Sequence, residues 1–162
     1  MLPLTERAIR ASFLNASRKE VSDLSLPAGF DELNWDDLTY LGWVDPKFPK
    51  RAYVVVEQED GSVAGVFLQQ GEKRTGSREQ CSWCDDVTLT NDVQFFAARK
   101  AGAAGRKGDT VGTLVCANFG CSAVVRKLPP LAYTGFDREA ARTERIRRLG
   151  ENVRGFLRTL TD

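Results

Sequence analysis

The chain has 162 residues, of which 42% are hydrophobic and 28% charged, and its formal net charge is +1. A chain of this size and composition can bury the core of one ordinary domain, or of a small domain with appendages, and its charge implies no overall attraction to nucleic acid or to a membrane surface. It has no histidine, which excludes the commonest general base, the Ser-His and Cys-His nucleophile pairs, and zinc sites that hold a catalytic water through imidazole ligands.

The N-terminal residues predict two short helices. Thr5 can cap a first helix that places Ile9 and Phe13 on one face. Residues 17–20 have the form of a capping box, which starts a second helix that stops before Pro27. Apolar stripes on helices usually face a core. We therefore expect both helices to pack on a sheet, with a partner-binding helical hairpin as the alternative.

The middle of the chain predicts strands. Residues 35–43 are rich in aromatic side chains, which we expect in the core or at its rim. Residues 52–56 and 63–68 predict two strands joined by a hairpin turn, and residues 93–98 and 110–115 predict two more. The predicted fold is α+β, a small antiparallel sheet with flanking helices and the zinc finger described next.

Four cysteines form two close pairs. Two residues separate Cys81 from Cys84, four separate Cys116 from Cys121, and 31 separate the two pairs. This is the spacing of a structural tetrahedral metal site, and four thiolates favour Zn²⁺, with iron as the minority option. Disulfides, a redox pair and unlinked core cysteines remain as alternatives. A zinc ion with four thiolate ligands has no open position, so it would be structural.

The spacing also predicts the local fold around the metal. The first pair can sit on a tight knuckle whose backbone N–H groups point at the sulfurs. The second pair is too far apart to lie on one helix face, so we expect its first cysteine to end a strand and its second to begin a helix after a turn at Gly120. A knuckle, a hairpin and a helix with the last ligand make a treble-clef zinc finger, which we place at residues 78–130.

Charge is distributed unevenly along the chain. Residues 1–70 hold 7 Lys/Arg against 11 Asp/Glu, and residues 71–162 hold 16 against 11, so the metal-bearing half is the basic one. One Zn²⁺ with four thiolates carries a charge of about −2, which Arg78 and Arg99 are candidates to offset. No apolar run reaches the length of a membrane span and no cleavable leader is visible, so we expect a cytoplasmic protein.

A basic segment separates the last two predicted strands. Residues 99–108 hold three glycines and four cations, Arg99, Lys100, Arg106 and Lys107. A stretch so poor in apolar bulk cannot bury itself, so we expect an exposed, mobile hairpin loop. It lacks the ending of a phosphate-binding loop. Because it precedes the second cysteine pair, we expect it beside the metal and predict that it contacts acidic protein or RNA phosphate; a solvated loop is the alternative.

The C-terminal residues predict one long helix capped by Asp137. Its apolar residues recur at spacings of three and four and form a single face: Ile146, Leu149, Val153, Phe156 and Leu160. We expect this face to pack on the domain, with self-pairing or a partner contact as alternatives. We predict one domain over residues 1–162, made of N-terminal helices and first hairpin (5–70), zinc finger (78–130) and C-terminal helix (137–161).

Several motifs together resemble a known family. They are Tyr40-Leu-Gly-Trp43 ahead of two strands, Cys81-x-x-Cys84, Gly112-Thr113 before Cys116, and Cys116-x-x-x-x-Cys121. Over roughly residues 5–130, the sequence resembles the treble-clef zinc-finger domain of FusB-type proteins, the FBP domain. FusB itself has an additional N-terminal helical bundle, where this sequence predicts only two short helices.

The resemblance implies an α/β domain whose zinc finger binds elongation factor G, promotes its release from the ribosome and protects against fusidic acid. By position, the four cysteines match the family's zinc ligands, and the loop with Lys107 and Thr110 matches the region that faces the partner.

We therefore predict a non-enzymatic adaptor with one structural Zn²⁺ that binds elongation factor G in translation, possessing no membrane segment and no small-molecule substrate. The residues predicted to contact the partner are Arg99, Lys100, Arg106, Lys107 and Thr110. The alternative is an RNA- or ribosome-binding zinc-finger protein that uses the same loop, residues 99–107, and an enzyme is the third reading.

Overall fold

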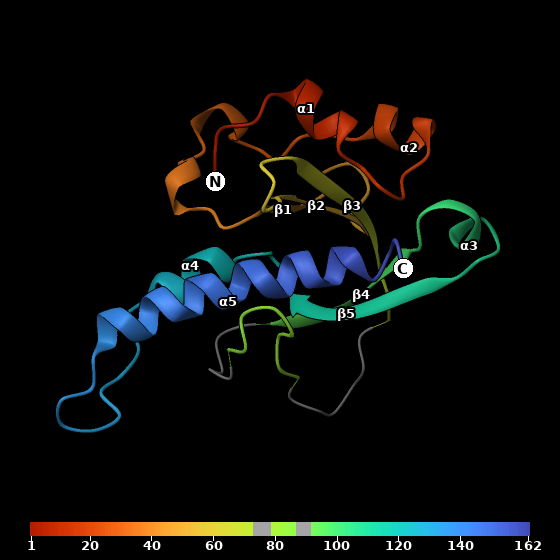
Figure 1. Ribbon diagram of the computed structural model, residues 1–162. Helices are drawn as coiled ribbons and strands as arrows, with labels where there is room; N and C mark the ends of the chain where they lie inside the picture. The colour runs from red at the N-terminus through yellow and green to blue at the C-terminus, as the bar shows by residue number, and fades with distance from the viewer. Residues whose placement is uncertain (73–78, 87–91) are drawn as a thin grey trace.

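The computed structural model describes residues 1–72, 79–86 and 92–162, and its centre is a five-stranded sheet (Figure 1). The strands lie side by side in chain order, and each neighbouring pair is antiparallel. They are β1 (Leu41–Val44), β2 (Arg51–Glu57), β3 (Val63–Gln70), β4 (Val93–Arg99) and β5 (Thr110–Cys116). The predicted antiparallel sheet with flanking helices is confirmed, and all four predicted strands are present.

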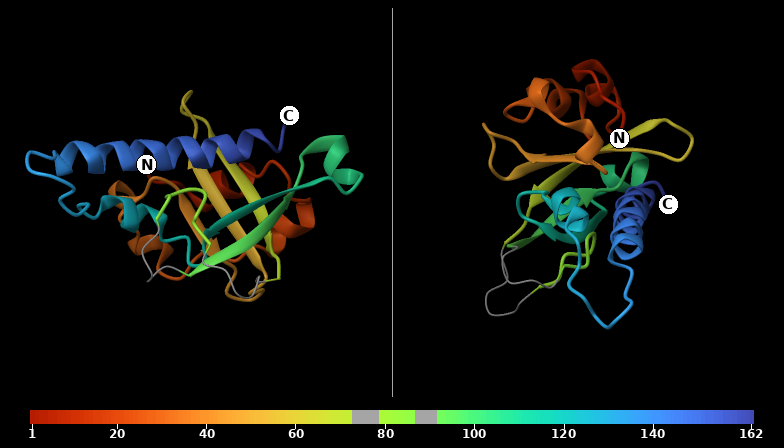
Figure 2. Two further views of the ribbon diagram at one scale, coloured as in Figure 1. Left: turned by 90° about the horizontal axis from the view of Figure 1, so that it is seen from below. Right: turned by 90° about the vertical axis from the view of Figure 1, so that its left-hand side faces the viewer.

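The sheet separates two apolar cores. One core lies between β1–β3 and the N-terminal segment, and includes Ile9, Trp43 and Phe67. The other lies on the opposite face and includes Val54, Leu68 and the four cysteines. The right-hand view of Figure 2 shows the N-terminal helices on one side of these strands and the two C-terminal helices on the other. Side chains of β2 alternate between the two cores, as the two-residue period of a strand requires.

The N-terminal helices begin where the sequence predicts. They are α1 (Glu6–Ala11) and α2 (Arg18–Asp23). Thr5 accepts a hydrogen bond from the Ala8 N–H, and Ser17 and Glu20 form the complete capping box. Since the caps satisfy backbone donors that the helix leaves unpaired, these short helices have defined starts even though little of their surface is buried.

The strand β1 was not predicted from the sequence. It has only four residues, with Gly42 in the middle, and its period is hidden among aromatic residues. It pairs with β2, where Leu41 faces Val55 and Trp43 faces Tyr53. A short strand with an internal glycine has a low intrinsic strand propensity, so this segment is extended because it pairs with β2.

The hairpin of β4 and β5 turns away from the other strands. Seven residue pairs join β4 to β5, whereas two, Gln69 with Ala97 and Gln70 with Phe96, join β3 to β4. The left-hand view of Figure 2 shows this hairpin crossing the direction of β2 and β3. The hairpin therefore brings Phe96 into the same core as Leu68, and the curved sheet encloses the metal centre.

Two helices follow the second cysteine pair. They are α4 (Cys121–Arg126) and α5 (Arg138–Arg158), and Asp137 accepts a hydrogen bond from the Ala140 N–H at the start of α5. The predicted apolar face of α5 packs into the core that holds the cysteines, which confirms core packing as its role. No helix among the described residues is long and apolar enough to cross a membrane.

The basic segment contains a helix that was not predicted, α3 (Gly102–Arg106). A Cβ at Gly105 would lie 1.7 Å from the Lys100 carbonyl oxygen, so glycine is required for this close turn. The Ala101 N–H donates to the Leu160 carbonyl at 2.8 Å, which ties the segment to the C-terminal turn. Gly105 serves tight backbone packing, whereas Gly102 and Gly108 adopt positive φ. Composition cannot distinguish either use from the glycines of an irregular loop.

Candidate metal centre

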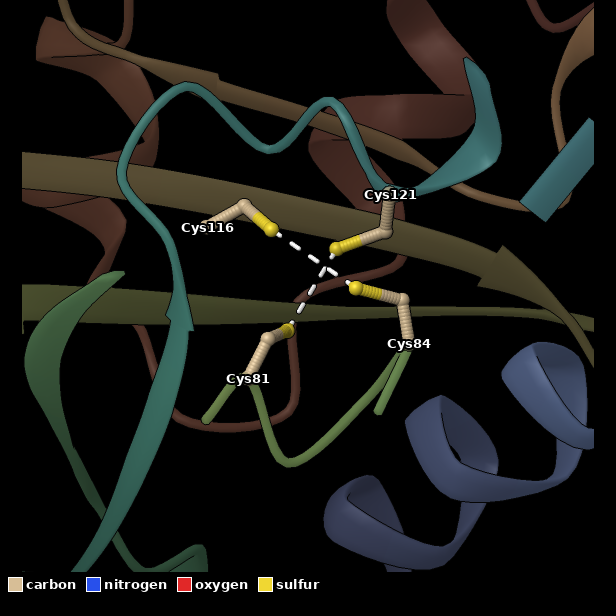
Figure 3. A group of neighbouring side chains, drawn as sticks. All are labelled: Cys81, Cys84, Cys116 and Cys121. Atoms are coloured by element: carbon tan, nitrogen blue, oxygen red, sulfur yellow. Dashed lines mark hydrogen bonds between the residues drawn. The ribbon is translucent and has the colours of Figure 1, made fainter. Parts of the chain in front are cut away.

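The four cysteine side chains converge on one point in the second core (Figure 3). Cys81 and Cys84 lie on the turn before β4, Cys116 ends β5, and Cys121 begins α4. All four are buried, and their sulfurs lie within 4.8 Å of one another. The structure thus brings together every cysteine that the sequence analysis predicted as a ligand.

The spacing of the sulfurs fits zinc and excludes disulfides. The Sγ atoms of Cys81 and Cys121 are 3.7 Å apart, as are those of Cys84 and Cys116, and all four cysteines are free thiols. A disulfide would hold two sulfurs about 2.05 Å apart. A tetrahedron with Zn–S bonds of about 2.3 Å has edges of about 3.8 Å. The donor set and its size therefore suit one Zn²⁺.

Each cysteine pair lies on a tight knuckle that includes a left-handed residue. In the first knuckle, residues 81–85, Asp85 has φ 55° and its N–H donates to the Cys81 carbonyl at 3.0 Å. In the second, residues 116–121, Phe119 has φ 55° and its N–H donates to the Cys116 carbonyl at 2.8 Å. Non-glycine residues rarely adopt this conformation, so the surrounding packing must hold both turns.

Aromatic side chains form that packing. Trp83, from the first knuckle, contacts Tyr40 edge-on with ring centroids 5.4 Å apart and lies 6.4 Å from the ring of Phe119. The Tyr40 hydroxyl donates to the Phe119 carbonyl at 3.1 Å. Burial, with charge on nearby sulfurs adding to it, raises the pKa of Tyr40 well above its ordinary value. Tyr40 therefore stays a neutral donor that connects β1 to the second knuckle.

The helix α5 holds the first knuckle from the outside. Asn152 donates to the Trp83 carbonyl at 3.0 Å, and Arg148 forms an ion pair with Asp85 at 3.1 Å. A third contact comes from β5, where the Leu114 carbonyl accepts from the Ser82 N–H at 2.8 Å. The sequence analysis did not predict these contacts. The periodicity of α5 identifies its apolar face, but it does not show which polar residues of the helix contact the first knuckle.

The protonation of the sulfurs depends on the metal. Hydrogen bonds from Cys116, then from Cys121 and Cys84, lower the pKa of Cys81. Hydrogen bonds with Cys116 and Cys81 raise the pKa of Cys121. Neighbouring thiols thus shift the pKa of Cys81 and that of Cys121 in opposite directions, whereas a bound Zn²⁺ would supply the positive charge that deprotonates every ligand. Zinc binding is coupled to proton release and weakens at low pH.

The basic segment lies far from the metal centre, and the expectation that it sits beside the metal is wrong. Arg99 pairs with Thr110 at one end of the β4–β5 hairpin, whereas Val93 pairs with Cys116 at the other. Six residue steps along a strand span about 20 Å. The segment precedes the second cysteine pair in sequence, but β5 carries it to the opposite end of the hairpin.

The predicted contact residues have different surroundings. Arg99 forms an ion pair with Glu20 at 2.6 Å, so it does not offset the charge of the metal centre as expected. The Lys100 ammonium donates to the Asp162 carbonyl at 3.1 Å. Arg106, Lys107 and Thr110 are exposed. Arg78, the other candidate to offset that charge, lies outside the described residues.

Comparison with known proteins supplies the family. A family model described as the FBP C-terminal treble-clef zinc-finger matches residues 8–160. Among solved structures, the chain is similar to one titled "Structure of the fusidic acid resistance protein FusC", with 19% sequence identity and a TM-score of 0.49. That likeness covers 66% of this chain and 51% of the other, so this chain spans about half of the other's length. No curated protein matches the sequence.

The family match extends further than the resemblance seen in the sequence, which covered residues 5–130. It includes α5, the helix that supports the first knuckle. The match also agrees with the four buried sulfurs, and the prediction of zinc as the cofactor is confirmed. The chain belongs to the FBP C-terminal treble-clef zinc-finger family.

Proposed function

We propose that the protein is an adaptor that binds elongation factor G and promotes its release from the ribosome, with protection against fusidic acid as the consequence. The observation that carries this proposal is the family match over residues 8–160. FusB-type proteins, which the sequence resembles at the cysteine pairs and at residues 40–43, act on elongation factor G in this way.

The chemistry of the site supports a role without catalysis. Among the residues that the structure describes, the four cysteines form the one cluster suited to a metal ion. Because all four are ligands, a zinc ion there has no open position for water or substrate. The zinc holds two strained knuckles together, and with them the surface that α5, β5 and the first knuckle share.

The basic segment is the first candidate for contact with elongation factor G. Lys100, Arg106 and Lys107 lie at the exposed end of the β4–β5 hairpin. Charges at such a rim steer association and set its register more than they add raw affinity. Arg99 differs from them, because its ion pair with Glu20 ties the segment to α2.

Charge reversal tests this candidate. We expect Arg106→Glu with Lys107→Glu to slow association with elongation factor G roughly tenfold at low salt, with little change in Tm, because both side chains are exposed. The matched control is Arg18→Glu with Lys19→Glu, an exposed pair on α2. Stopped-flow association rates measure the effect. Equal rates for the two double variants would show that the basic segment does not contact elongation factor G.

Ribosome sedimentation tests the proposed function itself. Elongation factor G that is bound to ribosomes pellets with them, so its release can be followed by sedimentation in the presence of fusidic acid. We expect added protein to move elongation factor G into the supernatant, whereas zinc-depleted protein leaves it in the pellet. If the protein instead binds ribosomal RNA without the factor, and its affinity falls steeply with salt, then the RNA-binding alternative is correct.

A further inference from the structure

The segment between α4 and α5 gathers exposed apolar side chains. Among the described residues, seven large hydrophobic side chains are exposed, and three of them lie within six positions here. Leu128 is 42% exposed, Leu131 69% and Tyr133 66%. Scattered exposed hydrophobic residues are ordinary, but contiguous ones mark interaction surfaces. We call residues 127–137 the projecting loop, because it extends away from the sheet at the N-terminal end of α5 (Figure 1, lower left).

Two arginines of α5 hold the projecting loop in place. Arg138 donates to the Pro129 carbonyl at 2.7 Å, and Arg145 donates to the Lys127 carbonyl at 3.3 Å. Inside the loop, the rings of Tyr133 and Phe136 meet edge-on with centroids 5.3 Å apart. The loop thus presents Leu131 and Tyr133 on an arranged backbone, which reduces the entropy lost when a partner binds.

The surroundings of the projecting loop are strongly basic. Residues 126–148 hold seven Lys/Arg against three Asp/Glu, although the whole chain has a net charge of only +1. Arg138 and Arg145 direct their guanidinium groups at backbone carbonyls, which satisfy hydrogen bonds without cancelling charge. Three other arginines of this stretch are ion-paired, Arg142 with Glu139, Arg147 with Glu144 and Glu151, and Arg148 with Asp85. The apolar anchors therefore sit beside two guanidinium groups, those of Arg138 and Arg145, whose positive charge the backbone carbonyls do not cancel.

We propose that the projecting loop is a docking surface for a protein partner whose matching face is acidic around an apolar groove. Tyrosine and arginine are the residue types that dominate interface energetics, and apolar anchors surrounded by charge match the anatomy of protein interfaces. A single-stranded RNA would be met by stacked aromatic rings, whereas two of the three exposed side chains here are leucines. The partner is elongation factor G, so this inference rests on the proposed function.

Truncation of the anchors tests the surface. The variants are Leu131→Ser and Tyr133→Ser, and the control is Leu2→Ser, whose side chain is equally exposed, at 68%, in the N-terminal segment. Titration calorimetry with elongation factor G measures Kd for each. We expect Tyr133→Ser to raise Kd about 30-fold and Leu131→Ser about tenfold, the losses typical of anchor residues. Leu2→Ser should bind like the unaltered protein, and all variants should keep its Tm and zinc content.

The outcomes separate the two proposals. If the unaltered protein binds and both loop variants bind equally well, the docking surface is wrong and the proposed function stands. If the unaltered, zinc-loaded protein does not bind elongation factor G, the proposed function is overturned, and this inference with it. If the loop variants lose affinity for a single-stranded RNA probe but not for elongation factor G, the assignment to an acidic protein partner is overturned.

Discussion

Residues 40–43 show how one short segment serves both cores. Leu41 and Trp43 point into the core under the N-terminal helices, and the Trp43 indole donates to the Ser25 carbonyl at 2.8 Å. Tyr40 points into the other core, against Trp83. The motif that carried the family resemblance thus has a physical basis, because it places an aromatic support at the metal centre and anchors the opposite face.

Gly42 leaves space for the second knuckle. A Cβ at this position would lie 2.7 Å from the Tyr40 ring and 2.8 Å from the Phe119 Cβ. We expect Gly42→Ala to lower the free energy of unfolding by about 1–3 kcal/mol, the usual cost of overpacking. The control is Gly155→Ala in α5, where a Cβ would meet only Arg158 at 3.7 Å. It should be neutral or raise stability by up to about 1 kcal/mol. Chemical denaturation of both variants measures the contrast, and equal effects would contradict the packing described here.

Loss of one ligand tests the metal assignment. We expect Cys116→Ser to lose bound zinc and to lower the free energy of unfolding by at least about 3 kcal/mol, because the binding energy of a structural zinc ion is folding energy. For a chain of this size, that lowers Tm by roughly 6–12 °C. Val125→Ala is the control, since it thins the same core but keeps all four ligands. Metal analysis and thermal melts decide, and a Cys116→Ser variant with one zinc per chain and an unchanged Tm would contradict the assignment.

At the residue scale, the sequence predicts the metal ligands but not the ion-pair partners of the charged side chains. Cysteine spacing identifies all four ligands, because few side chain types bind zinc and the chain has only these four cysteines and no histidine. Arg99 could not be placed, because its partner Glu20 is 79 positions away and nothing local marks the pair. Long-range ion pairs at a surface depend on the tertiary fold.

At the scale of elements, local signals locate helix starts and hairpins. Thr5, Ser17 and Asp137 each cap a helix as predicted, because capping depends on a few neighbouring residues. The predictions miss β1 and α3. β1 exists through its pairing with β2, and α3 through the packing of Gly105 against the Lys100 carbonyl and the hydrogen bond from Ala101 to the distant Leu160.

The contact between α2 and β4 should respond to pH. Burial alone would raise the pKa of Glu20, but hydrogen bonds from Ser17 and Arg99 outweigh it and lower that pKa. A lowered pKa in the folded state contributes stability above the unfolded value of about 4.3, and this stability is lost as the pH falls through the folded pKa. We expect Glu20→Gln to cost about 0.5 kcal/mol at pH 7, given the partial exposure of the pair.

Thermal melts of Glu20→Gln and the unaltered protein from pH 7 to pH 3 provide the measurement. The difference in stability should shrink below about pH 4. Loss of zinc in acid affects both proteins alike, so the comparison cancels it. A difference that stays constant over the whole range would show that Glu20 does not titrate as described.

At the scale of the molecule, α5 connects the two surfaces that we propose contact a partner. The projecting loop precedes its first residue, and the basic segment is tied to its end through Ala101 and Leu160. A helix of 21 residues spans about 30 Å. The two surfaces therefore lie at opposite ends of one rigid element, and losses from the two sets of variants should add, as is usual for distant sites.

The position of these surfaces could not be predicted from the sequence. The basic segment and the second cysteine pair are neighbours in the chain, and an extended strand separates them in space. In the sequence, the projecting loop resembles an ordinary connection that contains proline. Only the exposure of Leu131 and Tyr133 in the folded protein distinguishes it from a turn.

We propose that zinc maintains a surface that binds elongation factor G. The most direct measurement is titration calorimetry of elongation factor G with zinc-loaded protein and with protein from which a chelator has removed the metal, with zinc content determined for both. We predict saturable binding at one protein per factor for the loaded form and none for the depleted form. Absence of binding by protein that carries one zinc per chain would contradict the account.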